Sequence, residues 1–154
     1  MSLPEWLKNG WLIKHQTSPE EIRDLLGIAD RDLVDCQAAG LSPDWRFNIA
    51  YNAALQAATA ALAAAGYRAE RTSHHYRVIQ TLAYTIGADD NLIAQFDQFR
   101  KKRNLSDYDR AGMVSDHEAQ EALDLARKLR QGVEKWIKSK HPKLVSQING
   151  QEQR

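Results

Sequence analysis

Apolar residues recur at intervals of three and four along most of the chain, which is the spacing of an amphipathic helix. The first such stretch begins at Ser18-Pro19, where an N-cap serine precedes a proline suited to the first helical turn, and Glu21 supplies the glutamate of a capping box. Its apolar positions are Ile22, Leu25, Leu26, Ala29, Leu33 and Cys36. The pattern predicts a helix over 19–39 that ends before Gly40.

The next stretch repeats the start signal at Ser42-Pro43 and is rich in alanine. Nine alanines fall between residues 53 and 65, on more than one helical face. Small side chains let neighbouring helices approach closely, as the central helix of a bundle requires. We therefore expect a helix that runs to Ala65, with Gly66 as its C-terminal cap.

The first half of this alanine-rich helix carries polar groups. Asn48, Asn52 and Gln56 share one face at steps of four, and Tyr51 lies beside them. Buried amides need hydrogen-bond partners, so these side chains either bridge neighbouring helices or line a groove. Asn48, Tyr51 and Asn52 are the candidates for a groove.

Two further helical regions follow. A third helix is expected over 73–86, and its inward positions are Tyr76, Ile79, Leu82, Ala83 and Ile86. Gly87 interrupts it, and Asp89-Asp90 start a second segment whose apolar residues are Leu92, Ile93, Phe96 and Phe99. Residues 105–114 are expected to form a loop. A capping box at Ser115 then starts a last helix that runs to about Ser139.

These elements predict an all-α fold, an up-and-down bundle of four main helices whose third helix is broken. No segment shows the alternation of a strand. Residues 1–17 are apolar enough to dock on the bundle as a short accessory helix or hook, residues 18–140 form the bundle, and residues 141–154 form a polar tail.

Composition excludes several classes of protein. Cys36 is the only cysteine, which suits a reducing cytoplasm and a small core residue rather than a nucleophile. The five histidines lack metal-ligand spacing, and no glycine-rich phosphate loop is present, so we expect neither a metal nor a cofactor. The most apolar run is short and broken by polar residues, so no membrane span is expected.

One cluster of residues has the composition of a binding site. Leu92, Phe96 and Phe99 form a stripe whose next position is Arg103, so a guanidinium that cannot lose its charge continues a core face. Around it lie further cations, an amide and a tyrosine: Arg100, Lys101, Lys102, Asn104 and Tyr108. Residues 1–66 carry five Lys or Arg against eight Asp or Glu, and the remainder carries sixteen against twelve, so a local basic face is consistent with the charge distribution.

The order of helices, with Arg103-Asn104 after the broken third one, resembles the HEPN superfamily (higher eukaryotes and prokaryotes nucleotide-binding) over residues 18–140. In that family an arginine and a polar residue are followed after a few positions by a histidine. The resemblance implies a homodimer that brings these motifs together in a cleft. It also implies nucleotide or RNA binding, or metal-independent ribonuclease activity, in some members as a toxin paired with a small nucleotidyltransferase.

The chain departs from the family pattern at one position, because Tyr108 stands where the histidine is expected. Tyrosine, with an ordinary pKa near 10, is a poor proton acceptor at neutral pH. Three hypotheses follow. In the favoured one the chain is a non-catalytic interaction protein that holds a nucleotide, RNA or protein partner at the basic cluster. In the second it is a ribonuclease in which Arg103 acts with Tyr108 or with a histidine from elsewhere. In the third Arg103 only pairs with Asp107 or Asp109.

Overall fold

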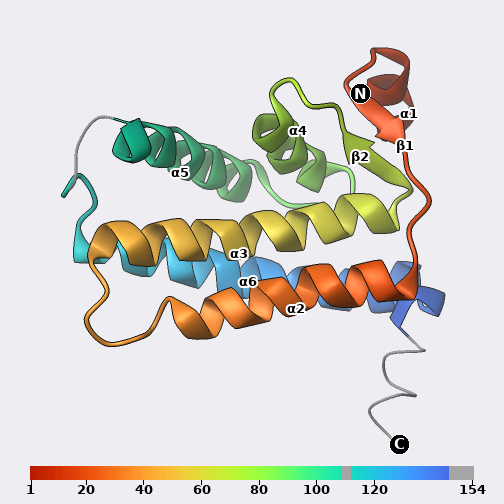
Figure 1. The fold of residues 1–154 in the computed structure, drawn as a ribbon. Helices are drawn as coiled ribbons and strands as arrows, with labels where there is room; N and C mark the ends of the chain where they lie inside the picture. The colour runs from red at the N-terminus through yellow and green to blue at the C-terminus, as the bar shows by residue number, and fades with distance from the viewer. Residues whose placement is uncertain (109–111, 146–154) are drawn as a thin grey trace, which may run out of the picture.

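A computed structural model describes the backbone over residues 1–108 and 112–145, and the side chains over 1–104 and 112–145 (Figure 1). Three long helices lie side by side: α2 (Pro19–Asp35), α3 (Pro43–Ala64) and α6 (Asp116–Lys140). The other main helix, α5 (Asp90–Tyr108), lies across α3 from α2, next to the short α4 (His74–Gln80). The predicted all-α helical bundle is confirmed.

The serines predicted to start the three long helices do so. Ser18, Ser42 and Ser115 each accept a hydrogen bond from the backbone N–H three residues later. Only Ser115 forms a complete capping box, so the capping box predicted at Ser18 is wrong. The side chain of Glu21 instead accepts hydrogen bonds from Thr17 and His15. The first helix also ends at Asp35 rather than Ala39.

Helix α3 is the centre of the core. From Ala53 to Ala64 every residue is buried except Gln56 and Thr59, which are half-buried. Because most of these side chains are alanines, α2 and α6 can pack closely against it on two sides. At the end of α2, Cys36 is 1% exposed, and burial raises the pKa of its thiol, which fits the core role predicted for it.

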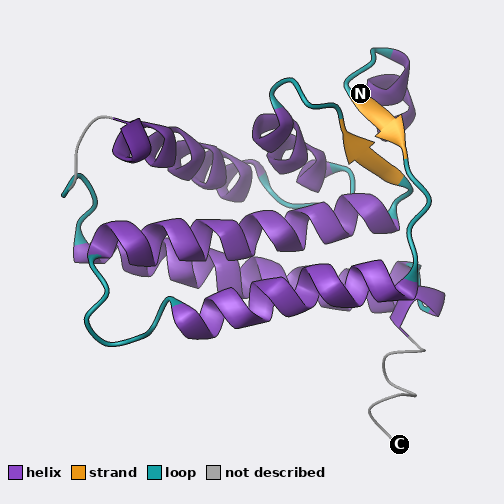
Figure 2. Ribbon diagram, in the orientation of Figure 1, coloured by secondary structure: helices purple, strands orange, loops and turns teal. Residues whose placement is uncertain are grey.

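A two-stranded ribbon was not predicted. The strands β1 (Leu12–Lys14) and β2 (Tyr67–Ala69) pair antiparallel, with Leu12 opposite Ala69 (Figure 2). Each strand has three residues, too few for the alternation that identifies a strand in a sequence. Helix α1 (Leu3–Lys8) precedes the ribbon, and the rings of Trp6 and Trp11 pack edge to face at 5.4 Å. The N-terminal segment therefore docks through a helix and a strand.

The third helix is shorter than the predicted 73–86. After α4 the chain tightens into one 3₁₀ turn, Thr81–Ala83, where the Thr81 hydroxyl donates to the carbonyl of Val78 at 2.7 Å. Val78, Ile79 and Leu82 face the core, whereas Tyr76 and Ala83, predicted to point inward, are exposed. The inward positions predicted at Ile79 and Leu82 are therefore confirmed, and those at Tyr76 and Ala83 are wrong.

Helix α5 is longer than predicted. It continues through 105–108, which were expected to belong to a loop, because no helix-breaking residue occurs before Gly112, whose φ is +84°. Beyond α6, the segment predicted as a polar tail differs over 141–145. The ring of His141 packs on Trp136, and Val145 is 5% exposed in the core. The rest of that segment lies outside the described residues.

Candidate functional site

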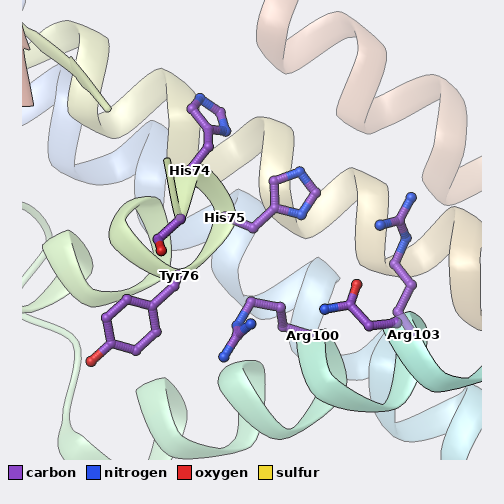
Figure 3. Close-up of a pocket in the computed structure, with 7 residues that line it drawn as sticks. His74, His75, Tyr76, Arg100 and Arg103 are labelled. Carbon is purple, nitrogen blue, oxygen red and sulfur yellow. The ribbon is translucent and has the colours of Figure 1, made fainter. Parts of the chain in front are cut away.

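The start of α4 and the second half of α5 face each other across an open pocket of about 350 Å³ (Figure 3). We call it the cation pocket and define it by its lining residues, Ser73, His74, His75, Tyr76, Arg100, Arg103 and Asn104. None of these described lining residues is acidic. Ser73 adopts a left-handed conformation with φ of +56°, a strained geometry for a residue other than glycine and one that is common at functional sites.

Arg103 reaches this pocket because it continues the apolar stripe of α5, as the spacing predicted. One and two turns earlier, Phe99 packs edge to face on Phe47 at 5.5 Å, and Phe96 packs on Tyr51 at 5.7 Å. The guanidinium of Arg103 then lies 5.4 Å from the centre of the Tyr51 ring. A cation over an aromatic face is stabilised by the negative potential of the ring face. Asp107 and Asp109, its predicted pairing partners, lie outside the described side chains.

Arg100 lies one turn before Arg103 and has an acidic neighbour. Its Nε donates to Asp97 at 2.7 Å, and its guanidinium lies 5.4 Å from the centre of the Tyr76 ring. A guanidinium carries five donor hydrogens, and among the described residues only Nε is engaged. Its terminal amino groups therefore stay available to an anion in the pocket.

The remaining cations of the predicted cluster have other neighbours. Lys101 is exposed and lies 3.6 Å from Asp97, on the same helix. Lys102 pairs with Glu118 at 3.0 Å and so ties α5 to α6. Asn104 lines the cation pocket, and the side chain of Tyr108 lies outside the described residues. Of the cluster chosen from the sequence, the structure brings Arg100, Arg103 and Asn104 together.

Tyr51 and His75 form a hydrogen-bonded pair beneath these arginines. The Tyr51 hydroxyl lies 3.2 Å from Nδ1 of His75, and Tyr51 is 2% exposed. Burial raises the pKa of Tyr51 to about 12. Burial, followed by the charges of Arg103, His74 and Arg100, lowers the pKa of His75. At neutral pH the pair therefore consists of a protonated phenol and a neutral imidazole.

Of the amides predicted either to bridge helices or to line a groove, Asn52 bridges two helices. Asn52 donates to the buried carboxylate of Asp32 at 2.7 Å, which joins α3 to α2, and Gln56 donates to Asn52. Asn48 lies on the same helix but does not line the cation pocket. Tyr51 does not line the pocket either, but it contacts two residues that do: its hydroxyl is hydrogen-bonded to His75, and its ring lies under the guanidinium of Arg103.

The structure adds four lining residues that sequence reasoning missed, Ser73, His74, His75 and Tyr76, and the two histidines matter most to the chemistry. The sequence places His74 and His75 only among the five histidines that lack metal-ligand spacing. Their ring centres are 5.8 Å apart, and Figure 3 shows the ring of His74 turned away from Arg100 while His75 lies between the two helices. The only signal in the sequence was the run Ser73-His74-His75 at the start of a helix. Nothing near it in the sequence indicated that α5 lies opposite.

The described residues were also searched for other kinds of site. They contain no group of three or more His, Cys, Asp or Glu side chains that could hold a metal ion. Within the same residues, no helix is long and apolar enough to span a membrane.

Comparison with known proteins identifies the fold family. The family model described as the HEPN domain matches residues 22–136, which include both walls of the cation pocket. No curated protein and no solved structure matches the chain. Since the matched region spans most of the chain, from α2 through α6, the chain belongs to the HEPN domain family.

Proposed function

We propose that the chain binds a phosphate group of a nucleotide or an RNA strand in the cation pocket and does not cleave it. The observation that carries this proposal is the pair of guanidiniums, Arg100 and Arg103, one turn apart beside two imidazoles, with no acidic residue among the described lining. Guanidinium groups bind phosphate through charge-assisted hydrogen bonds of fixed geometry. Membership of the HEPN family supports a nucleotide-related or RNA-related role.

The tautomer of His75 decides how it takes part. If the Tyr51 hydroxyl donates to Nδ1, the ring proton lies on Nε2, and His75 becomes a neutral donor to a phosphate oxygen. The raised pKa of Tyr51 keeps the phenol protonated and able to donate. This arrangement adds a third donor to those of Arg100 and Arg103, which suits binding rather than proton abstraction.

A ribonuclease is the second candidate, and the position of His75 favours it. If Nδ1 of His75 instead donates to the Tyr51 oxygen, Nε2 is left as a proton acceptor. Its lowered pKa keeps that nitrogen unprotonated at neutral pH. A ribose hydroxyl held there could lose its proton while Arg103 stabilises the phosphate charge. His75 would then take the role that Tyr108 cannot fill.

Binding is tested with a labelled single-stranded oligoribonucleotide in a chelator, followed by fluorescence anisotropy. Arg103→Ala should weaken binding by about 1.5–3 kcal/mol, the range for hydrogen bonds to charged groups. Lys101→Ala removes the same charge two residues away but lies outside the pocket, and it should have little effect. Equal losses in both variants would mean diffuse attraction and would contradict the pocket.

The same samples separate the two candidates. The binding proposal predicts that the oligoribonucleotide stays intact in chelator. Cleavage by the wild type that is lost in His75→Gln as well as in Arg103→Ala would instead establish the ribonuclease. Retention of cleavage in His75→Gln would exclude His75 as the proton acceptor.

We also propose that the chain forms a homodimer, as the family resemblance implies. Several large apolar side chains are exposed, among them Val34 at 70% and Trp45 at 62%. Apolar surface of this kind is often covered by a partner. A monomer mass in light scattering at tens of micromolar would contradict the dimer. A nucleotidyltransferase-type protein is the heterologous partner that the resemblance suggests.

A further inference from the structure

A second pocket adjoins the cation pocket, and its chemistry is different. Its volume is about 290 Å³, and it lies where α2, α3, α4 and the β1–β2 ribbon meet. Leu62 and Val78, each 1% exposed, belong to its wall together with Leu25 and Ala63. We call it the apolar pocket and define it by these four residues with His15, Glu21, Thr59, Tyr67, Arg68, Ala69 and His74.

His74 connects the two pockets, because it lines both of them. Its ring centre is 5.8 Å from that of His75, which lies in the cation pocket beside the arginines. The ring of His74 points away from Arg100 (Figure 3). A ligand that fills both pockets therefore passes the side chain of His74.

The wall of the apolar pocket includes a carboxylate, that of Glu21. Glu21 accepts from Thr17 at 2.6 Å and from His15 at 2.7 Å, and both bonds end on Oε1. Oε2 accepts no hydrogen bond from the described residues. Apolar walls with a few fixed polar groups are typical of small-molecule sites, where the polar groups set specificity.

We propose that the apolar pocket holds the base of a nucleotide whose phosphate lies in the cation pocket, and that Glu21 selects bases carrying an exocyclic amino group. The inference rests on the proposed function, since the phosphate must be bound at Arg100 and Arg103. A nucleotide combines an anion with a planar base whose faces are apolar and whose edges carry hydrogen-bonding groups, and the two pockets that meet at His74 have these two chemistries. Cytosine presents an amino donor where uracil presents a carbonyl acceptor, so Glu21 discriminates between them.

The test compares calorimetric affinities for CMP, UMP and ribose 5-phosphate. The wild type should bind CMP at least about tenfold more tightly than ribose 5-phosphate, which lacks a base, and more tightly than UMP. Thr59→Phe fills the apolar pocket from α3 and should reduce CMP affinity to that of ribose 5-phosphate, which should itself bind unchanged. Thr59→Val keeps the volume of the side chain and serves as its control. Thr59→Leu replaces the phenylalanine variant if that one fails to fold.

Two further variants separate the parts of the inference. Glu21→Gln should abolish the preference for CMP over UMP, because one carboxylate oxygen becomes an amide donor. Arg103→Ala should weaken all three ligands together. An oligocytidylate that binds more tightly than CMP and is weakened by Thr59→Phe would identify RNA as the source of the nucleotide. Weaker binding of the oligomer would identify the mononucleotide.

The inference and the proposed function fail in different ways. Two results would contradict the base pocket without contradicting the phosphate site. One is equal affinity of the wild type for CMP and ribose 5-phosphate, and the other is unchanged CMP affinity in Thr59→Phe. No binding of any of the three ligands or of the oligomer would overturn both. Loss of CMP binding in Thr59→Val would place the effect in the hydroxyl and would likewise overturn the base pocket.

Discussion

The layer formed by α2, α3 and α6 differs from the region formed by α4 and α5 in the surroundings of its charged side chains. In the layer, the buried carboxylate of Asp32 is held by Asn52, and Arg130 of α6 makes two hydrogen bonds to Asp30 of α2 at 2.8 and 2.9 Å. Between α4 and α5, Arg100 also pairs with Asp97 at 2.7 Å, but both Arg100 and Arg103 line an open pocket whose described lining contains no acidic residue.

This difference separates the residues that maintain the fold from those that serve a ligand. The alanine-rich interface of α3 buries its side chains almost completely, and beside it Arg130 of α6 pairs with Asp30 of α2. The pocket is built on the far side of the same helix, where Tyr51 supports both His75 and Arg103. The rigid core therefore positions the charged site.

The largest expected effect is loss of stability in the layer without loss of the site. Leu129 in α6 is 1% exposed, and Leu129→Ala should lower the free energy of unfolding by about 2–5 kcal/mol through the cavity it leaves. Urea unfolding measures this loss. Binding of the oligoribonucleotide to the folded variant should stay at the wild-type level. A parallel loss of affinity would contradict the claim that the layer and the binding site are independent.

Asn52→Ala should have the next largest effect. It removes the donor to Oδ2 of Asp32, while Oδ1 keeps its hydrogen bonds from Arg31, and it should cost about 1–3 kcal/mol, the penalty for a buried acceptor left without its partner. Urea unfolding at neutral pH checks the loss, with Gln120→Ala, an exposed residue of α6, as a surface control. A cost no larger than that of the control would show that the bridge between α2 and α3 is dispensable.

Tyr51→Phe acts at the junction of the two regions. The variant keeps the ring packing with Phe96 and loses the hydrogen bond to His75, so it should cost about 0.5–1.5 kcal/mol of stability. Tyr84→Phe, whose ring also packs on an aromatic neighbour, is the matched control. Affinity for the oligoribonucleotide should fall in Tyr51→Phe because His75 is no longer oriented. Unchanged affinity would contradict a role of His75 in binding the phosphate.

The smallest effect is a pH dependence. The pKa of His75 is lowered in the folded state, so the unfolded chain binds more protons just below the ordinary imidazole pKa near 6.5. The contribution to stability is present above that pH and is lost as pH falls through the folded pKa. Urea unfolding between about pH 7 and pH 5 should show a decrease that is smaller in His75→Gln. Equal slopes for both proteins would contradict the lowered pKa.

The sequence predicted the long helices well because their signals are local. The serines at 18, 42 and 115 start α2, α3 and α6, and the alanines of α3 lie where the core is. The position of Arg103 on the core stripe of α5 was also predictable, because helical spacing continues from Phe96 and Phe99.

The rest of the site depends on contacts between distant segments. His75 meets Tyr51 across 24 residues, and the pocket exists only because α4 crosses α5. The local sequence indicated that Glu21 is a capping residue. In the structure its side chain instead accepts hydrogen bonds from Thr17 and His15 and lines the apolar pocket. Three-residue strands and the break after α4 leave no periodic pattern, so the sequence could not reveal them.

Thermal unfolding of Arg103→Ala, with and without CMP, tests the central claim most directly. The account predicts that the variant without ligand unfolds within a few degrees of the wild type, because Arg103 serves a ligand more than the fold. At a CMP concentration of about 100 Kd the wild type should gain about 2.7 kcal/mol, roughly 5–10 °C for a domain of this size, and the variant should gain little. A large fall in the melting temperature of the unliganded variant, or an undiminished rise with CMP, would contradict it.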